Sequence, residues 1–363
     1  MAEVTKERIE EAIKGYVEPH LEKDLVKAKC VKDIAIEGDR VKVRIELGFP
    51  AEGIRAEVSA AVKKAVEGVD GVSTAEVETG WKVVAHSVQK SLKPIDSVKN
   101  IIAVASGKGG VGKSTTAINL ALALSAEGAK VGILDADIYG PSQPRMLGVS
   151  GQPESKDGKT LEPLENYGIQ AMSIGFLIDE ETPMIWRGPM VTQALEQLLN
   201  DTNWDSLDYL VIDLPPGTGD TQLTLAQKVP VSGAIIVTTP QDIALLDARK
   251  GFKMFEKVEV PVLGIVENMS THICSSCGHE EHIFGEGGGG RMAEQYGVDF
   301  LGALPLDIRI REETDGGKPT VVAEPEARIS QIYREIARKA AAKLALQAKS
   351  YAAKFPSIVI QNN

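Results

Sequence analysis

The alternation of apolar and polar residues predicts a small α+β unit at the start of the chain. In residues 41–47, Val41, Val43, Ile45 and Leu47 alternate with charged residues, the period-two pattern of a half-buried strand. The other elements expected here are helices over 4–20 and 54–68 and strands near 31–36 and 72–84. We therefore expect an accessory domain at residues 1–85, without a recognisable catalytic constellation.

Beyond residue 100 the pattern changes to apolar, β-rich runs separated by helical segments. Such runs recur at 101–106, 131–135, 209–213, 233–239, 260–266 and 299–304. Apolar strands alternating with helices indicate an α/β fold whose mostly parallel sheet is covered on both faces. The polar stretch 86–99 around Pro94 predicts a linker. The larger domain is expected at 100–345, followed by a C-terminal tail at 346–363.

Composition limits the functions that this chain can have. The 363 residues include 51 acidic and 40 basic side chains, a net charge of −11, so the chain is poorly suited to coat nucleic acid. It contains no run of about 20 apolar residues, and its charged start lacks the apolar core of a signal peptide. Three cysteines cannot form a disulfide framework. We expect a cytoplasmic protein with metal or redox chemistry.

A phosphate-binding loop follows the first strand of the larger domain. The run GKGGVGKST satisfies the pattern G-x-x-x-x-G-K-[ST] between a strand and an Ala/Leu-rich helix. Backbone amides and the helix N-terminus would surround the phosphates. Lys113 would reach the β- and γ-phosphates of ATP, and Ser114 would bind Mg²⁺. The loop consists of Gly107, Lys108, Gly109, Gly110, Val111, Gly112, Lys113, Ser114 and Thr115.

Three aspartates end apolar strands of the same domain. Asp135 ends the run at 131–135, with Asp137 two residues further on, and Asp213 ends the run at 209–213. Open α/β sheets bind ligands at this edge, and Asp213 is a candidate to hold Mg²⁺ through its hydration shell. Any one of them could simply cap a strand. All three together with the loop indicate a nucleoside triphosphatase.

Two of the three cysteines form a Cys-x-x-Cys pair in HICSSCGHEEH. Cys274 and Cys277 could bind structural zinc with histidines, although the spacings to His279 and His282 are tighter than usual. They could instead form a redox disulfide. An iron–sulfur cluster requires four thiolates, which two chains related by a dyad would supply. This stoichiometry favours a bridging cluster over the other two possibilities.

The loop also resembles that of the deviant Walker-A ATPases, which include the nitrogenase iron protein, MinD and ParA. For Lys108 the resemblance implies a contact across a nucleotide-sandwich dimer to the partner's phosphates. It further implies that Asp137 orients the attacking water, that Asp135 belongs to the Mg²⁺ shell, and that Asn268 contacts adenine.

Taken together, the motifs resemble the Mrp/ApbC group of ATP-binding iron–sulfur cluster carriers. They are GKGGVGKST, LDADIYGPS, WRGPM at 186–190, DLPPGTGD, ENMS, CSSC and IFGEGGG. The resemblance implies a homodimer with ATP, Mg²⁺ and a bridging 4Fe–4S cluster, which receives the cluster from a donor scaffold and transfers it to apoproteins. The first domain is similar to the small domain of iron–sulfur maturation factors, but it has GFPAEGI where such domains often carry a cysteine. Cys30 is expected to be a small buried residue.

Other functions remain open at this point. The basic segment 328–354 could anchor a MinD/ParA-like positioning ATPase to a membrane, with the cysteine pair binding zinc. A solvated helix that packs Ile329, Ile332, Tyr333 and Ile336 against the sheet is the simpler interpretation, so we expect no stable membrane association. An electron-donating reductase like the nitrogenase iron protein is a third possibility, although that protein's cluster ligands are separated along the chain.

Overall fold

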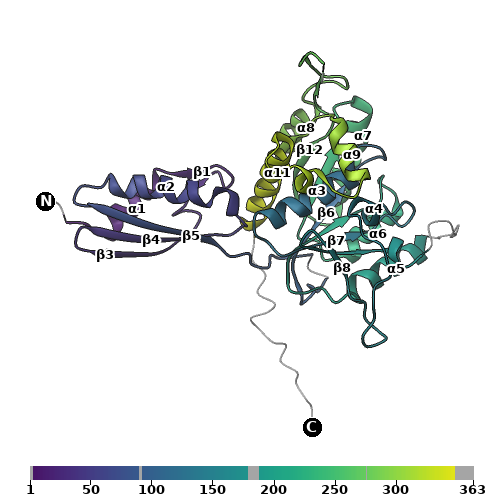
Figure 1. The fold of residues 1–363 in the computed structure, drawn as a ribbon, viewed down its shortest axis with the longest axis horizontal. Helices are drawn as coiled ribbons and strands as arrows, with labels where there is room; N and C mark the ends of the chain where they lie inside the picture. Colours follow the sequence, from purple (N-terminus) through teal and green to yellow (C-terminus); the bar gives the residue numbers. More distant parts are fainter. Residues whose placement is uncertain (1–2, 90–91, 179–187, 275, 348–363) are drawn as a thin grey trace, which may run out of the picture.

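The computed structural model describes residues 3–89, 92–178, 188–274 and 276–347. A small domain lies beside a larger sheet domain, and the last long helix of the chain lies next to their junction (Figure 1). Of the WRGPM motif, Trp186 and Arg187 fall outside the described residues, as does the expected tail beyond residue 347.

The small domain has the predicted α+β pattern, but the helix expected over 4–20 is shorter: it ends at Lys14 with Gly15 as its C-cap, and the short strand β1 follows at Val17. Its sheet has the order β3-β4-β5, with β3 antiparallel and β5 parallel to β4. The four apolar residues of β4 are buried as the alternation predicted, and burying each aliphatic side chain contributes about 1.5–3 kcal/mol. A short hairpin of β1 and β2 precedes this sheet. The elements are α1 (Lys6–Lys14), β1 (Val17–Glu18), β2 (Lys23–Asp24), β3 (Val31–Glu37), β4 (Arg40–Leu47), α2 (Arg55–Glu67) and β5 (Thr74–Trp81).

The larger domain contains an eight-stranded, mostly parallel sheet, which confirms the predicted fold class. Its strand order is β15-β12-β11-β6-β10-β7-β9-β8, and only β8 runs antiparallel to its neighbour. The six predicted strands are all present, whereas β8 and β9 had no counterpart in the sequence prediction. The strands are β6 (Val98–Ala105), β7 (Val131–Asp135), β8 (Leu164–Asn166), β9 (Ile169–Ser173), β10 (Leu207–Asp213), β11 (Gly233–Thr238), β12 (Val262–Glu267) and β15 (Asp299–Ala303).

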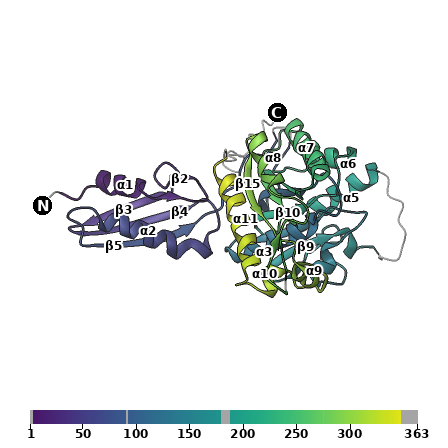
Figure 2. The ribbon, with the colours of Figure 1, turned by 90° about the horizontal axis from the view of Figure 1, so that it is seen from above.

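Helices pack against this sheet in two groups. Helices α3 and α11 pack on each other and on strands, while α7 and α8 pack together against β11, β12 and β15. Seen from above, α11 lies between the small domain and the sheet (Figure 2). In the described part of the chain, no helix combines the length and apolar content needed to cross a bilayer. The helices are α3 (Lys113–Ala126), α4 (Gln143–Met146), α5 (Gly188–Asn200), α6 (Asp220–Lys228), α7 (Asp242–Lys257), α8 (Gly288–Tyr296), α9 (Ile308–Asp315), α10 (Thr320–Ala323) and α11 (Arg328–Ala345).

A buried ionic cluster joins the two domains. Glu127, which follows the end of α3 and is fully buried, accepts hydrogen bonds from Arg334 Nε and Arg338 Nη1, both at 2.7 Å. It also accepts one from the backbone N–H of Gly53 in the small domain, at 2.8 Å. His20 of the small domain lies 2.9 Å from Glu335 of α11. The helix that begins at the phosphate loop therefore ends at the domain junction.

Candidate functional site

The phosphate loop lies between β6 and α3, as its sequence predicted. Gly110 and Gly112 have φ angles of +80° and +81°, in the left-handed region that glycine adopts without strain. Gly112 precedes the first residue of α3. A Cβ atom at this position would also contact Asn268 Nδ2, the end of a flexible side chain, so the positive φ is the stronger reason for glycine here.

Lys113, Ser114 and Asp213 meet at the carboxyl edge of the sheet. Lys113 Nζ lies 2.5 Å from Asp213 Oδ1 and 3.1 Å from Ser114 Oγ. Both charged side chains are buried, with exposed fractions of 6% and 0%. Parallel pairing of β10 with β7 places Asp213 directly beside Asp135. A buried lysine and hydroxyl next to a strand-end carboxylate match the groups that hold phosphate and Mg²⁺ in phosphate-loop enzymes.

Asp135 anchors the loop that follows β7. Its carboxylate accepts backbone hydrogen bonds from Asp137, Ser142 and Gln143 at 2.9–3.1 Å, and one from the Ser173 hydroxyl at 3.2 Å. Burial, followed by the charge of Asp213, raises the pKa of Asp135. Asp137 is less buried, and its pKa is also raised by burial, while the charge of Lys113 opposes the shift. Several carboxylates thus share one buried lysine, an arrangement that favours binding of a further cation.

Gln143 completes the site, and the sequence analysis did not predict it. Its side-chain amide donates to Asp213 Oδ2 at 2.9 Å and to the Ser114 backbone carbonyl at 3.2 Å. It therefore links the phosphate loop to the strand-end carboxylate. Within the described part of the chain, Ser142 Oγ and Gln143 Oε1 are buried without a hydrogen-bond partner. In the sequence, the only indication of a role for Gln143 was its position soon after Asp135 in LDADIYGPSQ. Nothing in the local sequence indicated which residues its side chain would contact.

The two remaining expected contacts lie at the loop itself. Lys108 is half-buried, and its backbone carbonyl accepts a hydrogen bond from the Ser106 hydroxyl at 2.9 Å. Asn268, just beyond β12, donates from Nδ2 to the Val111 carbonyl at 2.9 Å. The fold thus brings every predicted nucleotide residue to one edge of the sheet.

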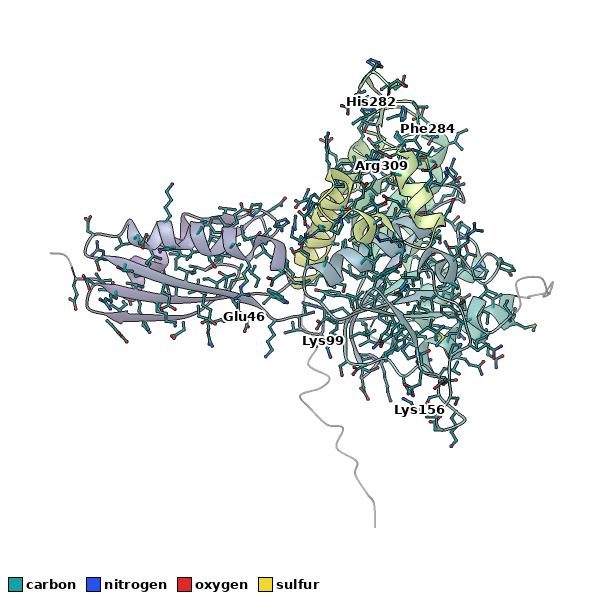
Figure 3. All side chains as sticks on the ribbon, viewed as in Figure 1. Glu46, Lys99, Lys156, His282, Phe284 and Arg309 are labelled. Atoms are coloured by element: carbon teal, nitrogen blue, oxygen red, sulfur yellow. The ribbon has the colours of Figure 1, made fainter. Side chains whose placement is uncertain are left out.

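The cysteine pair lies in the turn of a short hairpin. Strand β13 (His272–Ile273) pairs with β14 (Glu280–Glu281), and the Cys274 carbonyl accepts from the Gly278 N–H at 2.8 Å. The hairpin belongs to the segment projecting from the sheet domain near α8, where Figure 3 labels His282 and Phe284. Cys277 is exposed and Cys274 is half-buried. Hydrogen bonds from the backbone N–H groups of Ser276 and Cys277 lower the pKa of Cys274, which favours the thiolate that binds metal.

The metal ligands of a single chain are limited. Over the described ranges, no group of three or more His, Cys, Asp or Glu side chains is placed to hold one metal ion. The Nδ1 atoms of His272 and His282 lie 3.0 Å from the backbone carbonyls of Leu306 and Ser270.

Cys30 is buried in the small domain, with an exposed fraction of 4%, as predicted.

Comparison with known proteins identifies the family. The model of the NUBPL iron-transfer P-loop NTPase family matches residues 97–341. The chain belongs to this family. A second family model, described as an iron–sulfur cluster assembly protein, matches residues 6–78. The predicted resemblance to ATP-binding iron–sulfur cluster carriers is therefore confirmed at the level of the family.

Individual relatives agree with this assignment. An iron–sulfur cluster carrier protein of Pseudomonas fragi is 61% identical over 278 residues, which covers 76% of this chain and 97% of that protein. A protein of the same name from Haemophilus influenzae is 53% identical over 342 residues, covering 93% and 91%. Among solved structures, an ADP complex of a nucleotide-binding protein from Archaeoglobus fulgidus is 40% identical, with a TM-score of 0.57, and the match covers 64% of this chain and 91% of that one.

In this iron-transfer P-loop NTPase, helix α7 packs against the phosphate loop and against the start of α8. A Cβ atom at Gly107 of the phosphate loop would lie 2.1 Å from the backbone carbon of Asp247 in α7. A Cβ at Gly288, just beyond the hairpin, would lie 2.7 Å from Leu245 of the same helix. Two other apolar residues of α7, Ile243 and Leu246, are 71% and 53% exposed. Exposed apolar side chains therefore lie on the helix that packs against the phosphate loop.

Proposed function

We propose that this chain is an ATP-dependent iron–sulfur cluster carrier that assembles its cluster between two copies and transfers it to apoproteins. The observation that carries the proposal is the pair of thiols in the turn of an exposed hairpin. Backbone N–H groups stabilise the Cys274 thiolate there, and Cys277 is open to solvent. A cargo that must leave again is best held at such an accessible position.

Counting ligands supports a bridging cluster. A 4Fe–4S cluster takes four thiolates, and each hairpin supplies two. A two-fold axis near the hairpin would bring Cys274 and Cys277 of both copies around one cluster. The exposed Ile243 and Leu246 of α7 fit a contact between copies, because burying exposed apolar surface favours association.

Hydrolysis of ATP at the nucleotide site would supply the free energy for loading or releasing the iron–sulfur cluster. We assign Lys113 and the amides of residues 107–115 to the phosphates of ATP, and Ser114 and Asp213 to Mg²⁺. The Ser142 and Gln143 oxygens, buried without a partner in the described chain, fit a hydrated cation beside these carboxylates. The cation would neutralise charge that develops on the phosphates.

The family resemblance gives roles to the other residues of the nucleotide site. We assign Asp137 to the attacking water, Asp135 to the outer Mg²⁺ shell, Asn268 to adenine, and Lys108 to the phosphates of the partner copy. The accessory domain at 1–85 and the ATPase domain at 100–345 would act in one chain in the cytoplasm, where reducing conditions keep the thiols available. A donor scaffold would supply the cluster, and recipient apoproteins would accept it.

Anaerobic reconstitution with iron and sulfide tests the proposal. We expect visible absorption typical of a cluster, with about four iron and four sulfide per dimer. Cys277→Ala should lose the cluster and its transfer to an apo-ferredoxin acceptor, while still binding ATP. Stoichiometric zinc without sulfide, or normal transfer by Cys277→Ala, would contradict the carrier mechanism.

A further inference from the structure

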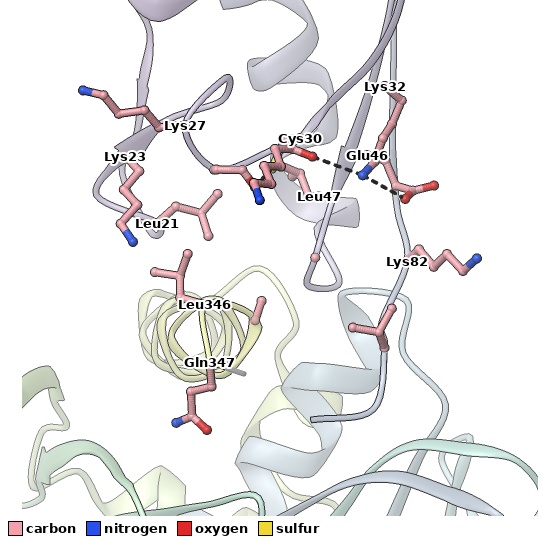
Figure 4. Close-up of a pocket in the computed structure, with 15 residues that line it drawn as sticks. Leu21, Lys23, Lys27, Cys30, Lys32, Glu46, Leu47, Lys82, Leu346 and Gln347 are labelled. Carbon is pink, nitrogen blue, oxygen red and sulfur yellow. Dashed lines mark hydrogen bonds and ion pairs between the residues drawn. The ribbon is translucent and has the colours of Figure 1, made fainter. Parts of the chain in front are cut away.

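Two adjoining cavities open at the junction of the domains, away from both sites described above. The first, with a volume of about 380 Å³, lies between the small domain and the end of α11 (Figure 4). The second, of about 420 Å³, lies between the β1–β2 hairpin and the β15–α11 region. Both are lined by Leu21, Lys23 and Leu346, so they adjoin each other, and we call the two together the junction groove.

The rim of the junction groove is basic. The first cavity is lined by five lysines and a single acidic residue, Glu46. The second adds Lys339 and Lys343, together with the acidic Glu22 and Asp299, so lysines still outnumber carboxylates around the whole groove. Four of these lysines form ion pairs with nearby carboxylates: Lys27, Lys32, Lys339 and Lys343. The ion pairs found among the described residues do not involve Lys23, Lys29 or Lys82, whose charges remain available to a ligand. This concentration of positive charge is unexpected on a chain whose net charge is −11, and it creates a local potential that attracts anions.

The inner wall of the groove is apolar. Leu21 and Leu47 are 3% and 0% exposed, and Leu346 presents 37% of its surface. Figure 4 shows Leu21 and Leu346 facing each other across the cavity, with the Lys23 ammonium group beside them. An apolar wall within a ring of lysines matches a ligand that has an apolar side chain between carboxylates.

The geometry favours a peptide segment over the other anions that such a surface could attract. The lysine heads are spread around the rim: in Figure 4, Lys27 and Lys82 point to opposite sides. Charges at this spacing suit an extended chain better than one compact phosphate. An anionic bilayer fits poorly, because the groove is a concave junction between two domains and the chain as a whole is acidic.

We propose that the junction groove docks an acidic segment of a partner protein, with one apolar side chain of that segment packed against the exposed surface of Leu346. The docking site is separate from the cysteine hairpin. A partner held at the groove would therefore leave the hairpin exposed. Docking here would raise the local concentration of the partner at the ATPase domain without occupying either of its sites.

Fluorescence anisotropy of the full chain with a labelled probe peptide tests the proposal. The probe has one leucine flanked on both sides by glutamates, and its matched control has serine in place of leucine. We expect the leucine peptide to bind about tenfold more tightly than the serine peptide, since one buried leucine side chain is worth that factor or more. Binding should weaken as salt is added.

Variants separate docking from general charge attraction. Lys23→Glu should weaken binding of the leucine peptide at least about tenfold, and Leu346→Ser should remove the preference for leucine. Lys64→Glu, an identical charge change at an exposed position of α2, should leave binding unchanged, and Lys23→Arg should retain it. Equal weakening by Lys64→Glu, or equal affinity for both peptides, would overturn the proposal. So would displacement of the peptide by anionic phosphatidylserine vesicles or by inorganic phosphate.

Discussion

His20 connects the two domains through a pair of carboxylates, and its ionisation can be predicted from the structure. Its Nδ1 lies 2.7 Å from Glu18 Oε1 and its Nε2 lies 2.9 Å from Glu335 Oε2. Burial by itself opposes protonation of the ring. The hydrogen bonds and charges of the two glutamates outweigh burial and raise the pKa of His20 from 6.5 to about 9. We therefore expect a charged histidine at the domain junction at neutral pH.

The raised pKa has a consequence for stability. The difference between 9 and 6.5 corresponds to at most about 3 kcal/mol, since one pKa unit equals 1.36 kcal/mol. Because the folded pKa lies above the unfolded one, this stabilisation is present in full below about pH 6.5. It is lost as the pH rises through about 9. The His20 side chain is only 7% exposed, but Glu335 is 40% exposed, and Arg338 Nε lies 3.3 Å from His20 Nε2. Screening by solvent and the nearby guanidinium therefore reduce the value below this upper limit.

NMR titration of the imidazole signals of His20 measures this pKa directly, with the chain in denaturant as the reference. We expect a midpoint near 9 in the folded protein, and a midpoint at least about one unit lower in Glu335→Gln, which removes one carboxylate. Raising the pH from 6.5 to 9 should lower the melting temperature of the unchanged protein, and it should lower that of His20→Gln by a smaller amount. A folded His20 that titrates at or below 6.5 would refute the reasoning.

The remaining predictions concern the two functional sites. Lys113→Ala should lower ATP affinity by about a hundredfold or more, because no other group replaces its charge at the phosphates; unchanged affinity in a filter-binding assay would remove Lys113 from the site. Asp137→Ala should leave ATP binding intact and slow hydrolysis by about a hundredfold, measured as phosphate release; a normal rate would exclude Asp137 from positioning the water. Cys30→Ala should retain the reconstituted cluster whereas Cys274→Ala should lose it, and iron loss in both variants would show that the cluster is not held by the hairpin alone.

Local patterns of the sequence determined most of the secondary structure and the identity of the chemical groups. The strict alternation in β4 predicted which side chains face the core, because successive side chains of a strand point to opposite faces. The phosphate loop could be recognised because its chemistry depends on consecutive residues between a strand and a helix. The cysteine pair could be recognised for the same reason. Strands β8 and β9 were missed because neither forms one of the apolar, β-rich runs on which the prediction relied.

The tertiary structure decided which distant residues act together. The pairing of Lys113 with Asp213 depends on β6 and β10 being neighbours in the sheet. The periodicity of apolar residues within a strand does not specify this strand order. The amide of Gln143 reaches Asp213 only because the loop after β7 folds back over that strand end. His20 acquires its raised pKa from Glu18, which is near it in the chain, and from Glu335, a residue of the last helix. A sequence pattern records which side chains can bind or ionise, but their electrostatic environment is set by contacts between segments far apart in the chain.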